Sequence, residues 1–543
     1  MQSISPADSE LAACLTAITA NGMARTAALI AAGTTGREPA GIVTYRSTGK
    51  LLVTGSASAI AEVTAALGGH SEITCTGLVD GAAEAPQLQG YLGNFELSVP
   101  TGVPQVYDLV LDMGHTPLLQ SALPPPGYFA PGDDRNALKA ALDEIPGLTG
   151  EFEKPQYFQY DESICAHSRS GITACTRCLD TCPADAIRSL GERIEVNPNL
   201  CQGAGTCATS CPTGAISYGY PRLVDTLQRM RVLLQAYRDA GGADAIILFH
   251  DAAAGRQAVM AMASQLPERV IPVEVEEPGS VGMDTWLATL AYGAAAVTLL
   301  AAPRTPVSVM REVAHQLTVA GEILTGMGYP PAALQLCQAG DSDLLDTLAA
   351  LPVTDGRATA SFAALDEKRT VIRLAVEHLY AEASKPRPLV SLSAGAPFGE
   401  VQVDDSRCTL CMACVSQCPA HALEAGTDSP QLVFIEANCV QCGLCCRTCP
   451  EDAIAASPRY LYDSQQARTR RVLYGEEPFL CIRCGKPFSN RKVIEKITAQ
   501  MKTHPMFQGG ALQRLKMCEN CRVKDMFAAE GLGEKPLSPG GSS

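Results

Sequence analysis

Two closely spaced cysteine runs between residues 408 and 450 constrain the fold of this chain more than any other feature. Both have the pattern Cys-x2-Cys-x2-Cys-x3-Cys-Pro. The cysteines are Cys408, Cys411, Cys414 and Cys418 in the first run and Cys439, Cys442, Cys445 and Cys449 in the second. Two-residue gaps let one tight loop bring three thiolates to the corners of a cubane iron-sulfur cluster, and the cysteine before proline reaches a neighbouring cluster. The pattern therefore favours two [4Fe-4S] clusters over a disulfide or zinc scaffold. Cys446 is surplus, either a spectator thiol or an alternative ligand beside Cys445.

This segment, residues 399–458, resembles the two-cluster bacterial ferredoxins. The resemblance implies that the last cysteine of each run ligates the cluster of the other run. The two implied ligand sets are Cys408, Cys411, Cys414 with Cys449, and Cys439, Cys442, Cys445 with Cys418.

A second, less regular ferredoxin-type module is predicted at residues 155–221. Its cysteines are Cys165, Cys175, Cys178, Cys182, Cys201, Cys207 and Cys211. The first gap has grown to nine residues, and Ala204 stands where the second half should have a cysteine. The same crossing of ligands predicts one complete [4Fe-4S] site and one site with three cysteines. The complete set is Cys165, Cys175, Cys178 and Cys211, and the incomplete set is Cys182, Cys201 and Cys207.

The incomplete site resembles the one in seven-iron ferredoxins, which hold a [3Fe-4S] cluster where a central cysteine is absent. The resemblance implies a [3Fe-4S] cluster, or a [4Fe-4S] cluster with an open iron near Ala204. His167, inside the long insert, is an alternative ligand to Cys165. A module that has lost its metal is the other interpretation, and seven cysteines in register argue against it.

Residues 475–528 carry a different cysteine pattern. Cys481-x2-Cys484 is followed, after 33 residues, by Cys518-x2-Cys521. Paired CxxC knuckles are typical of a tetrahedral four-cysteine metal site without an open position. The pattern predicts a zinc-ribbon-like segment with one structural zinc, and iron is the alternative.

Strand and helix signals alternate between residues 222 and 355. Apolar runs begin at residues 245, 270, 295 and 333, and helical patterns cover 253–265, 283–291, 305–327 and 342–350. This alternation predicts an α/β domain with a doubly wound parallel sheet. The uncharged stretch from Trp286 to Ala302 is then a buried helix followed by a buried strand rather than a membrane span.

This central domain resembles the delta subunit of methyl-viologen-reducing hydrogenase. The matching residues are Ala245-Ile-Ile-Leu-Phe, Gly282-Met-Asp-Thr and Ala291-Tyr-Gly-Ala-Ala-Ala-Val. Delta subunits carry cysteines for a [2Fe-2S] cluster, but this chain has His250-Asp251 in that stretch and a solitary Cys337. We therefore predict a docking domain without a cluster. The first strand is not followed by Gly-x-Gly-x-x-Gly, which argues against nucleotide binding.

The remaining segments carry no recognisable chemistry. Residues 1–150 predict an α+β domain of unknown role, with a hairpin joining strands at 41–46 and 51–55. Residues 356–398 predict a helix and a linker, and residues 529–543 a disordered tail. The fold class is therefore a multidomain combination of α+β and α/β parts.

Charge and cysteine usage limit the classes of partner. A net charge of −15 over 543 residues argues against nucleic acid or an anionic membrane as the main partner. Most of the 23 cysteines lie in metal-ligand spacings, which indicates a reducing cytoplasm. We find no export signal and expect no membrane span.

These features predict an electron-transfer subunit with three [4Fe-4S] clusters, the incomplete-site cluster and one zinc. In domain order the chain resembles the ferredoxin-type proteins that accompany bacterial formate dehydrogenases, which implies a dehydrogenase and a second redox protein as partners. Flavin, molybdopterin and nicotinamide signatures are absent, so we expect no substrate chemistry from the chain alone. The alternatives are a maturation or docking scaffold for a metalloenzyme, and an enzyme that uses the open iron near Ala204 as a Lewis acid.

Overall fold

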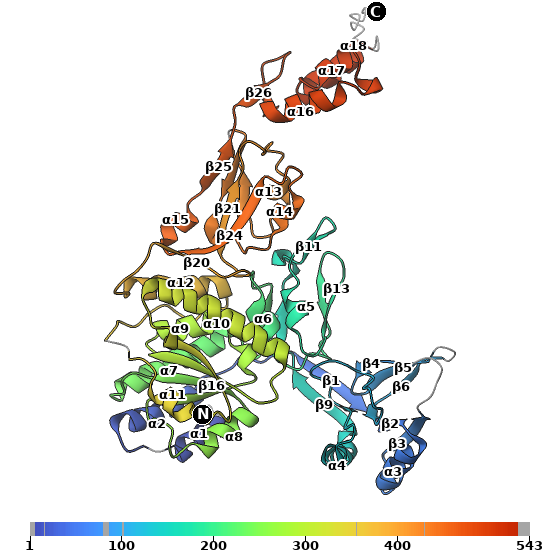
Figure 1. Ribbon diagram of the computed structural model, residues 1–543, viewed down its shortest axis with the longest axis vertical. Helices are drawn as coiled ribbons and strands as arrows, with labels where there is room; N and C mark the ends of the chain where they lie inside the picture. Colours follow the sequence, from blue (N-terminus) through green and yellow to red (C-terminus); the bar gives the residue numbers. More distant parts are fainter. Residues whose placement is uncertain are drawn as a thin grey trace, which may run out of the picture. The chain divides into compact units, whose positions relative to one another are not determined.

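The computed structural model describes residues 6–15, 17–79, 86–99, 103–353, 356–427 and 429–529 (Figure 1). The chain divides into two compact units, Met1–Ser393 and Ala394–Ser543. The predicted tail at 529–543 lies outside the described residues except for residue 529. Within the described ranges, no helix combines the length and the apolar composition needed to cross a bilayer.

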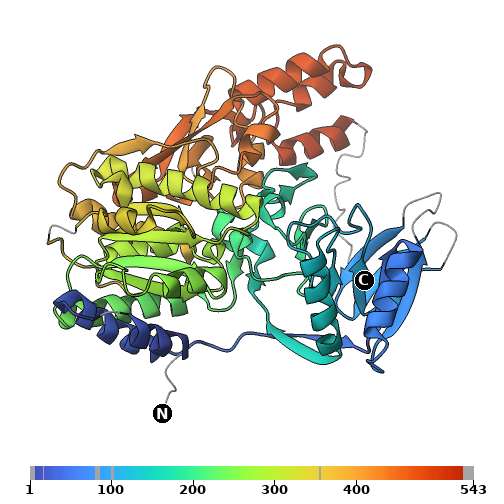
Figure 2. The ribbon, with the colours of Figure 1, turned by 60° about the horizontal axis from the view of Figure 1, so that its bottom comes forward.

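The first unit is centred on a four-stranded parallel sheet, ordered β17-β16-β18-β19. Its strands are β16 (Ile246–Asp251), β17 (Val270–Val275), β18 (Ala296–Ala301) and β19 (Leu334–Gln338). Every residue of β16 and β18 is buried, as expected for strands covered on both faces. Figures 1 and 2 show helices α8 (Ala254–Ala261) and α10 (Val307–Met327) on opposite sides of the sheet. The predicted strands and helices of residues 222–355 are confirmed, including α9 (Met283–Ala291) and α11 (Leu344–Ala349).

Helices from both ends of the first unit cover this central domain. Helix α2 (Ala20–Gly33) packs along α7 (Leu223–Asp239), and α12 (Lys368–Ala381) packs on α9. Arg25 of α2 is fully buried and donates to the carbonyls of Pro267 and Val270, both at 3.2 Å. Helix α1 (Pro6–Cys14) contacts β17. The first two helices of the predicted N-terminal segment therefore lie on the central domain.

The rest of that segment forms a second, smaller parallel sheet. Strand β2 (Lys50–Gly55) lies between β3 (Thr74–Val79) and β7 (Leu109–Asp112), and β8 (Tyr128–Phe129) follows β7. Helices α3 (Ala57–Leu67) and α4 (Arg135–Glu144) belong to the same part. Beside it, β4 (Gln87–Tyr91), β5 (Asn94–Ser98) and β6 (Gln105–Tyr107) form an antiparallel sheet.

The predicted hairpin at residues 41–55 is wrong in its pairing, although both strands exist. Strand β1 (Ile42–Ser47) pairs antiparallel with β9 (Gly150–Pro155) instead of with β2. The reason is burial: β2 is buried at five successive positions, so it needs a neighbour on each edge, whereas β1 alternates between exposed and buried. Asp108 fixes the segment that joins β1 to β2, because its carboxylate accepts hydrogen bonds from the backbone N–H groups of Thr48 at 2.7 Å and Lys50 at 3.1 Å.

The first ferredoxin-type module follows β9 directly. Strand β10 (Phe158–Tyr160) pairs with β15 (Ile216–Tyr218), and β13 (Ile187–Ser189) pairs with β14 (Ile194–Val196). Two short helices, α5 (Arg177–Thr181) and α6 (Thr206–Ser210), contact each other in its interior. The nine-residue insert forms a small hairpin of β11 (Ser168–Arg169) and β12 (Ile172–Thr173).

The second unit repeats this arrangement. Strand β21 (Gly399–Val403) pairs with β24 (Ile454–Leu461), β22 (Leu423–Ala425) pairs with β23 (Gln431–Phe434), and helices α13 (Ala413–Gln417) and α14 (Leu444–Thr448) contact each other. The unit ends with a β-hairpin and three helices. These are β26 (Pro478–Leu480), β27 (Pro487–Asn490), α16 (Arg491–Met501), α17 (Gly510–Arg514) and α18 (Glu519–Ala529).

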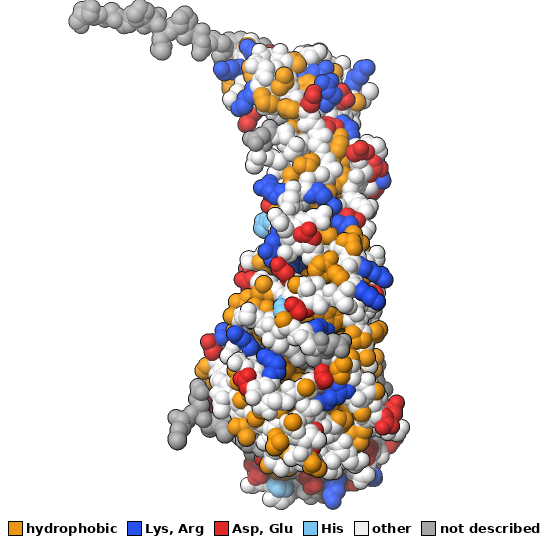
Figure 3. All heavy atoms as spheres, turned by 90° about the vertical axis from the view of Figure 1, so that its left-hand side faces the viewer, with side chains coloured by type: hydrophobic (Ala, Val, Ile, Leu, Met, Phe, Trp, Pro, Cys, Tyr) orange, Lys and Arg blue, Asp and Glu red, His pale blue; other side chains and the backbone are white. Residues whose placement is uncertain are grey.

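Charged side chains are interspersed by sign on the face of the molecule drawn in Figure 3. A nucleic-acid-binding surface gathers lysine and arginine on one face. On the side that the figure shows, Lys and Arg therefore do not gather on one such surface.

Candidate metal centres

Short helices set the positions of the cysteines in the second unit. Helices α13 and α14 each begin directly after a residue in the left-handed conformation, Met412 with φ 61° and Gly443 with φ 79°. They end at Cys418 and Cys449, whose φ and ψ angles agree within a few degrees (−74° and 108°, −69° and 114°). In each Cys-Pro-x-x-Ala sequence the alanine N–H donates to the cysteine sulfur, at 3.2 Å for Cys418 and 3.3 Å for Cys449. Such N–H···S bonds stabilise thiolates and tune clusters.

The thiols of the second unit meet in the two groups that crossed ligation requires. The pKa of Cys414 is raised to about 12 by burial, with Cys411, Cys408 and Cys449 as the neighbours that raise it further. The pKa of Cys442 is raised to about 11, again by burial first, with Cys418 and Cys439 among its neighbours. Buried thiols become thiolates only beside a balancing cation, which is what an iron cluster provides. The residues present therefore fit two clusters.

Cys446 lies beside this arrangement rather than apart from it. Its thiol is hydrogen-bonded to that of Cys445, and this bond lowers the pKa of Cys446 to about 7. The contact keeps both interpretations of Cys446 open, as a spectator thiol or as an alternative ligand.

The first module brings its seven cysteines together in the same crossed manner. Burial raises the pKa of Cys178, and Cys211, Cys175 and Cys165 raise it further, which places these four thiols around one site. Burial also raises the pKa of Cys207 well above its ordinary value, with Cys201 and Cys182 as the largest contributors among the thiols and Cys178 of the complete set after them. Both predicted sets of the module are thus assembled, one complete and one with three thiols.

Ala204 occupies the place of a missing ligand. Helix α6 begins directly after Gly205, whose φ of 77° matches the 79° of Gly443 before α14. Ala204 precedes Gly205 as Cys442 precedes Gly443, so the alanine methyl stands where the other module has a thiol. The loop is held on both sides: Tyr218 donates to the carbonyl of Gly203 at 2.7 Å, and a Cβ on Gly205 would come within 2.3 Å of the Cα of Ser280.

His167 does not have a free nitrogen for iron. It is 2% exposed; Nδ1 lies 2.9 Å from the carbonyl oxygen of Cys175, and Nε2 lies 2.8 Å from the hydroxyl of Ser189. A carbonyl only accepts, so Nδ1 carries the proton and Nε2 accepts from the serine. The geometry argues against His167 as a substitute for Cys165 and makes it an anchor of the insert.

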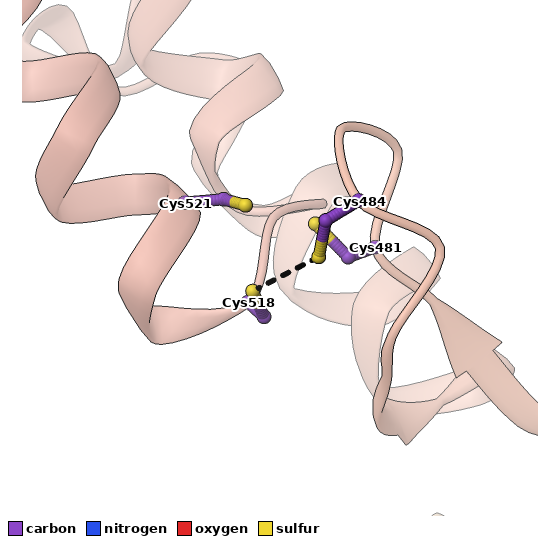
Figure 4. A group of neighbouring side chains, drawn as sticks. All are labelled: Cys481, Cys484, Cys518 and Cys521. Atoms are coloured by element: carbon purple, nitrogen blue, oxygen red, sulfur yellow. Dashed lines mark hydrogen bonds between the residues drawn. The ribbon is translucent and has the colours of Figure 1, made fainter.

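The four C-terminal cysteines converge on one point (Figure 4). Cys481 and Cys484 come from the loop between β26 and β27, while Cys518 directly precedes α18 and Cys521 lies in its first turn. Their sulfurs all lie within 4.8 Å of one another, and those of Cys484 and Cys518 are 3.6 Å apart. Metal–sulfur bonds of about 2.3 Å put tetrahedral sulfurs about 3.8 Å apart, so this spacing fits one ion. A cubane, with four irons between the sulfurs, needs a wider set.

Two lysines that sequence reasoning missed contact the first module. Lys154 donates to the carbonyl of Cys201, and Lys368, the first residue of α12, donates to the carbonyl of Cys211. Lys154 is near the module in sequence, but Lys368 is 157 residues from Cys211, so no local pattern indicates it.

A cavity of about 410 Å³ lies at the edge of this module. It is lined by residues from three segments, including Thr213, Asp284 and Lys368. Its lining does not include Ala204 or any of the three cysteines of the incomplete site. Nor does the lining include a cysteine of the complete site, so it ties the cavity to neither cluster site.

Comparison with known proteins agrees with the geometry over limited parts of the chain. Residues 148–215 match the 4Fe-4S dicluster domain family, and residues 401–424 match the 4Fe-4S binding domain family. The chain is 44% identical over 48 residues to Hydrogenase-4 component A of Escherichia coli (strain K12), which covers 9% of this chain and 23% of that protein. It is 30% identical over 60 residues to a ferredoxin of Rickettsia felis, which covers 11% of this chain and 55% of that protein. The chain thus spans about a quarter of one curated relative and about half of the other, and it carries two ferredoxin-type 4Fe-4S domains.

Proposed function

We propose that this chain is a multi-cluster electron-transfer protein that relays single electrons between a dehydrogenase and a second redox protein. The observation that carries the proposal is the sorting of fifteen cysteines, in two ferredoxin-type domains, into three sets of four and one set of three. Bound clusters would supply one-electron storage at each set. The protein supplies thiolate ligands, N–H···S hydrogen bonds and partial exclusion of water.

The proposed cofactors are three [4Fe-4S] clusters, a [3Fe-4S] or open [4Fe-4S] cluster at the Ala204 site, and one structural zinc. The spacing of the four C-terminal sulfurs supports a single ion there. Zinc is favoured over iron because four thiolates close the coordination sphere and zinc is the usual ion of such knuckles.

A formate dehydrogenase is the dehydrogenase that we propose, on the resemblance in domain order. The central domain would dock a partner and carry no cluster. At the end of β16, where delta subunits have cysteines, His250 is fully buried with Nδ1 2.9 Å from the carbonyl of Asp251, and the Asp251 carboxylate accepts the N–H groups of Ala253 and Gly255. These contacts stabilise the start of α8.

The test is electron transfer by protein purified without oxygen. Chemically reduced protein should pass its electrons to an artificial acceptor such as cytochrome c, and should not turn over formate or NADH alone. Cys414→Ser, which removes a ligand, should lower the number of electrons delivered. Cys14→Ser is the matched control, because Cys14 is exposed and outside the cysteine sets. Oxidation of formate or NADH by the isolated chain would contradict the proposal.

A maturation or docking scaffold is the second candidate, favoured by the closed four-cysteine site and the central domain without cluster cysteines. It predicts that Cys414→Ser leaves assembly and activity of the partner enzyme intact although fewer electrons are delivered, and that the protein is needed only during assembly. An enzyme acting through an open iron is less well supported, because the lining of the 410 Å³ cavity does not include Ala204.

A further inference from the structure

Lys154 places a positive charge against the three-cysteine site without a carboxylate to neutralise it. Its Nζ lies 3.0 Å from the carbonyl oxygen of Asn199 and 2.5 Å from that of Cys201. The Tyr45 ring covers it, 4.9 Å from ring centroid to nitrogen, and the Tyr45 hydroxyl donates to Asn199 at 2.6 Å. Lys154 takes part in none of the ion pairs found among the described residues. Burial lowers the pKa of Lys154 to about 8, which leaves the ammonium form in excess at neutral pH, and the carbonyls, which are acceptors only, suit that form.

Lys368 is placed in the same way at the complete site. Its Nζ donates to the carbonyls of Ala208, Thr209 and Cys211, at 3.0 Å for Ala208 and 3.1 Å for Cys211. These carbonyls are at the end of helix α6, where the helix dipole favours a cation. Asp284 and Glu312 act on Lys368 at longer range, but neither lies within ion-pair distance of it in the described part of the chain.

Two cations near the second module, Lys492 and Arg459, lie beside carboxylates by contrast. Lys492, whose charge acts on Cys408, lies 3.4 Å from a carboxylate oxygen of Glu476. Arg459 is 2.8 Å from Glu400 and 2.7 Å from Glu436. The two modules therefore differ in unbalanced charge, although their cysteine scaffolds agree.

We propose that Lys154 and Lys368 are positioning residues that raise the reduction potentials of the two clusters of the first module, one lysine for each cluster. The inference rests on the proposed function, since it requires clusters at these sites. Each bond to a ligand cysteine's carbonyl holds the ammonium group a few bonds from the sulfur. Reduction adds one negative charge to the cluster, and a nearby uncompensated cation stabilises that form more than the oxidised form. The first module is then the higher-potential pair.

The experiment is a redox titration of the anaerobic full chain, with each cluster followed by electron paramagnetic resonance. Lys154→Met should shift the reduction potential of the cluster at the three-cysteine site. Lys368→Met should shift that of the cluster at the complete site of the same module. The expected shift is about tenfold in the ratio of reduced to oxidised cluster at a fixed potential, or about 59 mV for one electron, towards lower potential. Lys154→Arg and Lys368→Arg keep the charge and should stay near wild type. Lys139→Met, on an exposed face of α4, is the control and should shift neither reduction potential.

The outcomes separate the inference from the proposed function. Wild-type protein that binds no iron at these sites would refute the function itself. Full iron loading with unchanged potentials in both methionine variants would overturn the inference alone. Equal shifts in the arginine and methionine variants would also overturn it, because the cause would be geometry rather than charge. If Lys368→Met fails to assemble, the variants Lys154→Met and Lys154→Arg decide the question. The cluster of the complete site should keep its potential in both of them and serves as the internal control.

Discussion

Gly205 and Gly443 hold the same left-handed backbone conformation, each one residue before a short helix whose far end is a cluster cysteine. Equal backbone geometry at these two positions means that the preceding residues, Ala204 and Cys442, start from equivalent places. The difference between the two sites is then a single sulfur atom.

Ala204→Cys should complete the incomplete site. Because a methyl group cannot ligate iron, air-oxidised wild type should show the resonance signal of an oxidised [3Fe-4S] cluster. The variant should lose that signal and gain about one iron per chain, by resonance and iron analysis. Cys442→Ala is the reciprocal variant and should create a second signal of this kind. If wild type has no such signal and neither substitution changes the spectrum, the assignment of this module is wrong.

Metal content should be about 15 irons and one zinc per chain after anaerobic purification, if the Ala204 site holds three irons. Elemental analysis measures both metals on one sample. A fully loaded preparation with about 8 irons or fewer would exclude clusters from the first module.

Cys518→Ser should release the C-terminal ion and destabilise the hairpin and helices around it, because binding of a closed four-thiolate site contributes directly to folding. The expected result is loss of zinc, a lower melting temperature and unchanged cluster spectra. The exposed Cys14→Ser variant controls for removal of a thiol. Retained zinc with the loss of a cluster signal would show that the metals are assigned the wrong way round.

Asn490→Ala should lower the free energy of unfolding of the second unit by about 1–2 kcal/mol. This loss is larger than that expected from removing an exposed helix cap. Asn490 is 5% exposed, caps α16 through the N–H of Val493 at 2.9 Å, and donates to the carbonyl of Thr409 at 3.0 Å, beside Cys408. Asp463→Ala removes a cap only, at the exposed start of α15 (Ser464–Arg468), and is the control. Denaturant unfolding measures both, and equal losses would show that the bond to Thr409 contributes nothing.

Glu268 should hold helix α2 in place above about pH 4.5 and lose this effect below it. Hydrogen bonds, chiefly from the Thr19 side chain, lower the pKa of Glu268 to about 2. A carboxyl with a depressed pKa stabilises the fold when ionised, and the contribution falls as pH drops from about 4.5 towards 2.

Glu268→Gln tests this contact at neutral pH, where clusters are retained. Amide hydrogens of Ala20–Gly33 should exchange faster than in wild type. Glu62→Gln, which breaks an exposed ion pair with Arg135, should leave that helix unchanged. Unchanged exchange in the Glu268 variant would mean that apolar packing alone holds α2.

Local patterns predicted the elements well because their causes are local. Alternating apolar runs and helical periods placed β16, β17, β18 and α9 within a few residues. Partner choice was not predictable in the same way. The residues at 47–49 read as a turn, but full burial of Leu51, Leu52 and Val53 decided that β2 pairs on both edges with distant strands.

The candidate sites show the same division. The spacing of the cysteines along the chain indicated which thiols belong to metal sites, because the spacing of neighbouring ligands is a property of one short loop. Lys368 and Asn490 reach their sites only through tertiary packing, over 157 and 81 residues. The sequence left His167 open as an alternative to Cys165, because it does not show that Ser189 takes the second ring nitrogen.

The docking of α2 on the central domain has a consequence for the growing chain on the ribosome. Thr19 and its partner Glu268 are separated by 249 residues, so at about 5–20 residues per second the helix waits roughly 12–50 s for its partner to be synthesised. Until α7 and the central sheet have been made, Ala24, Ala28 and Leu29, which are fully buried in the finished fold, lack most of the surface that covers them. An early segment of this unit is thus among the last to fold, and α2 is the place where a chaperone that holds short apolar segments would bind the nascent protein.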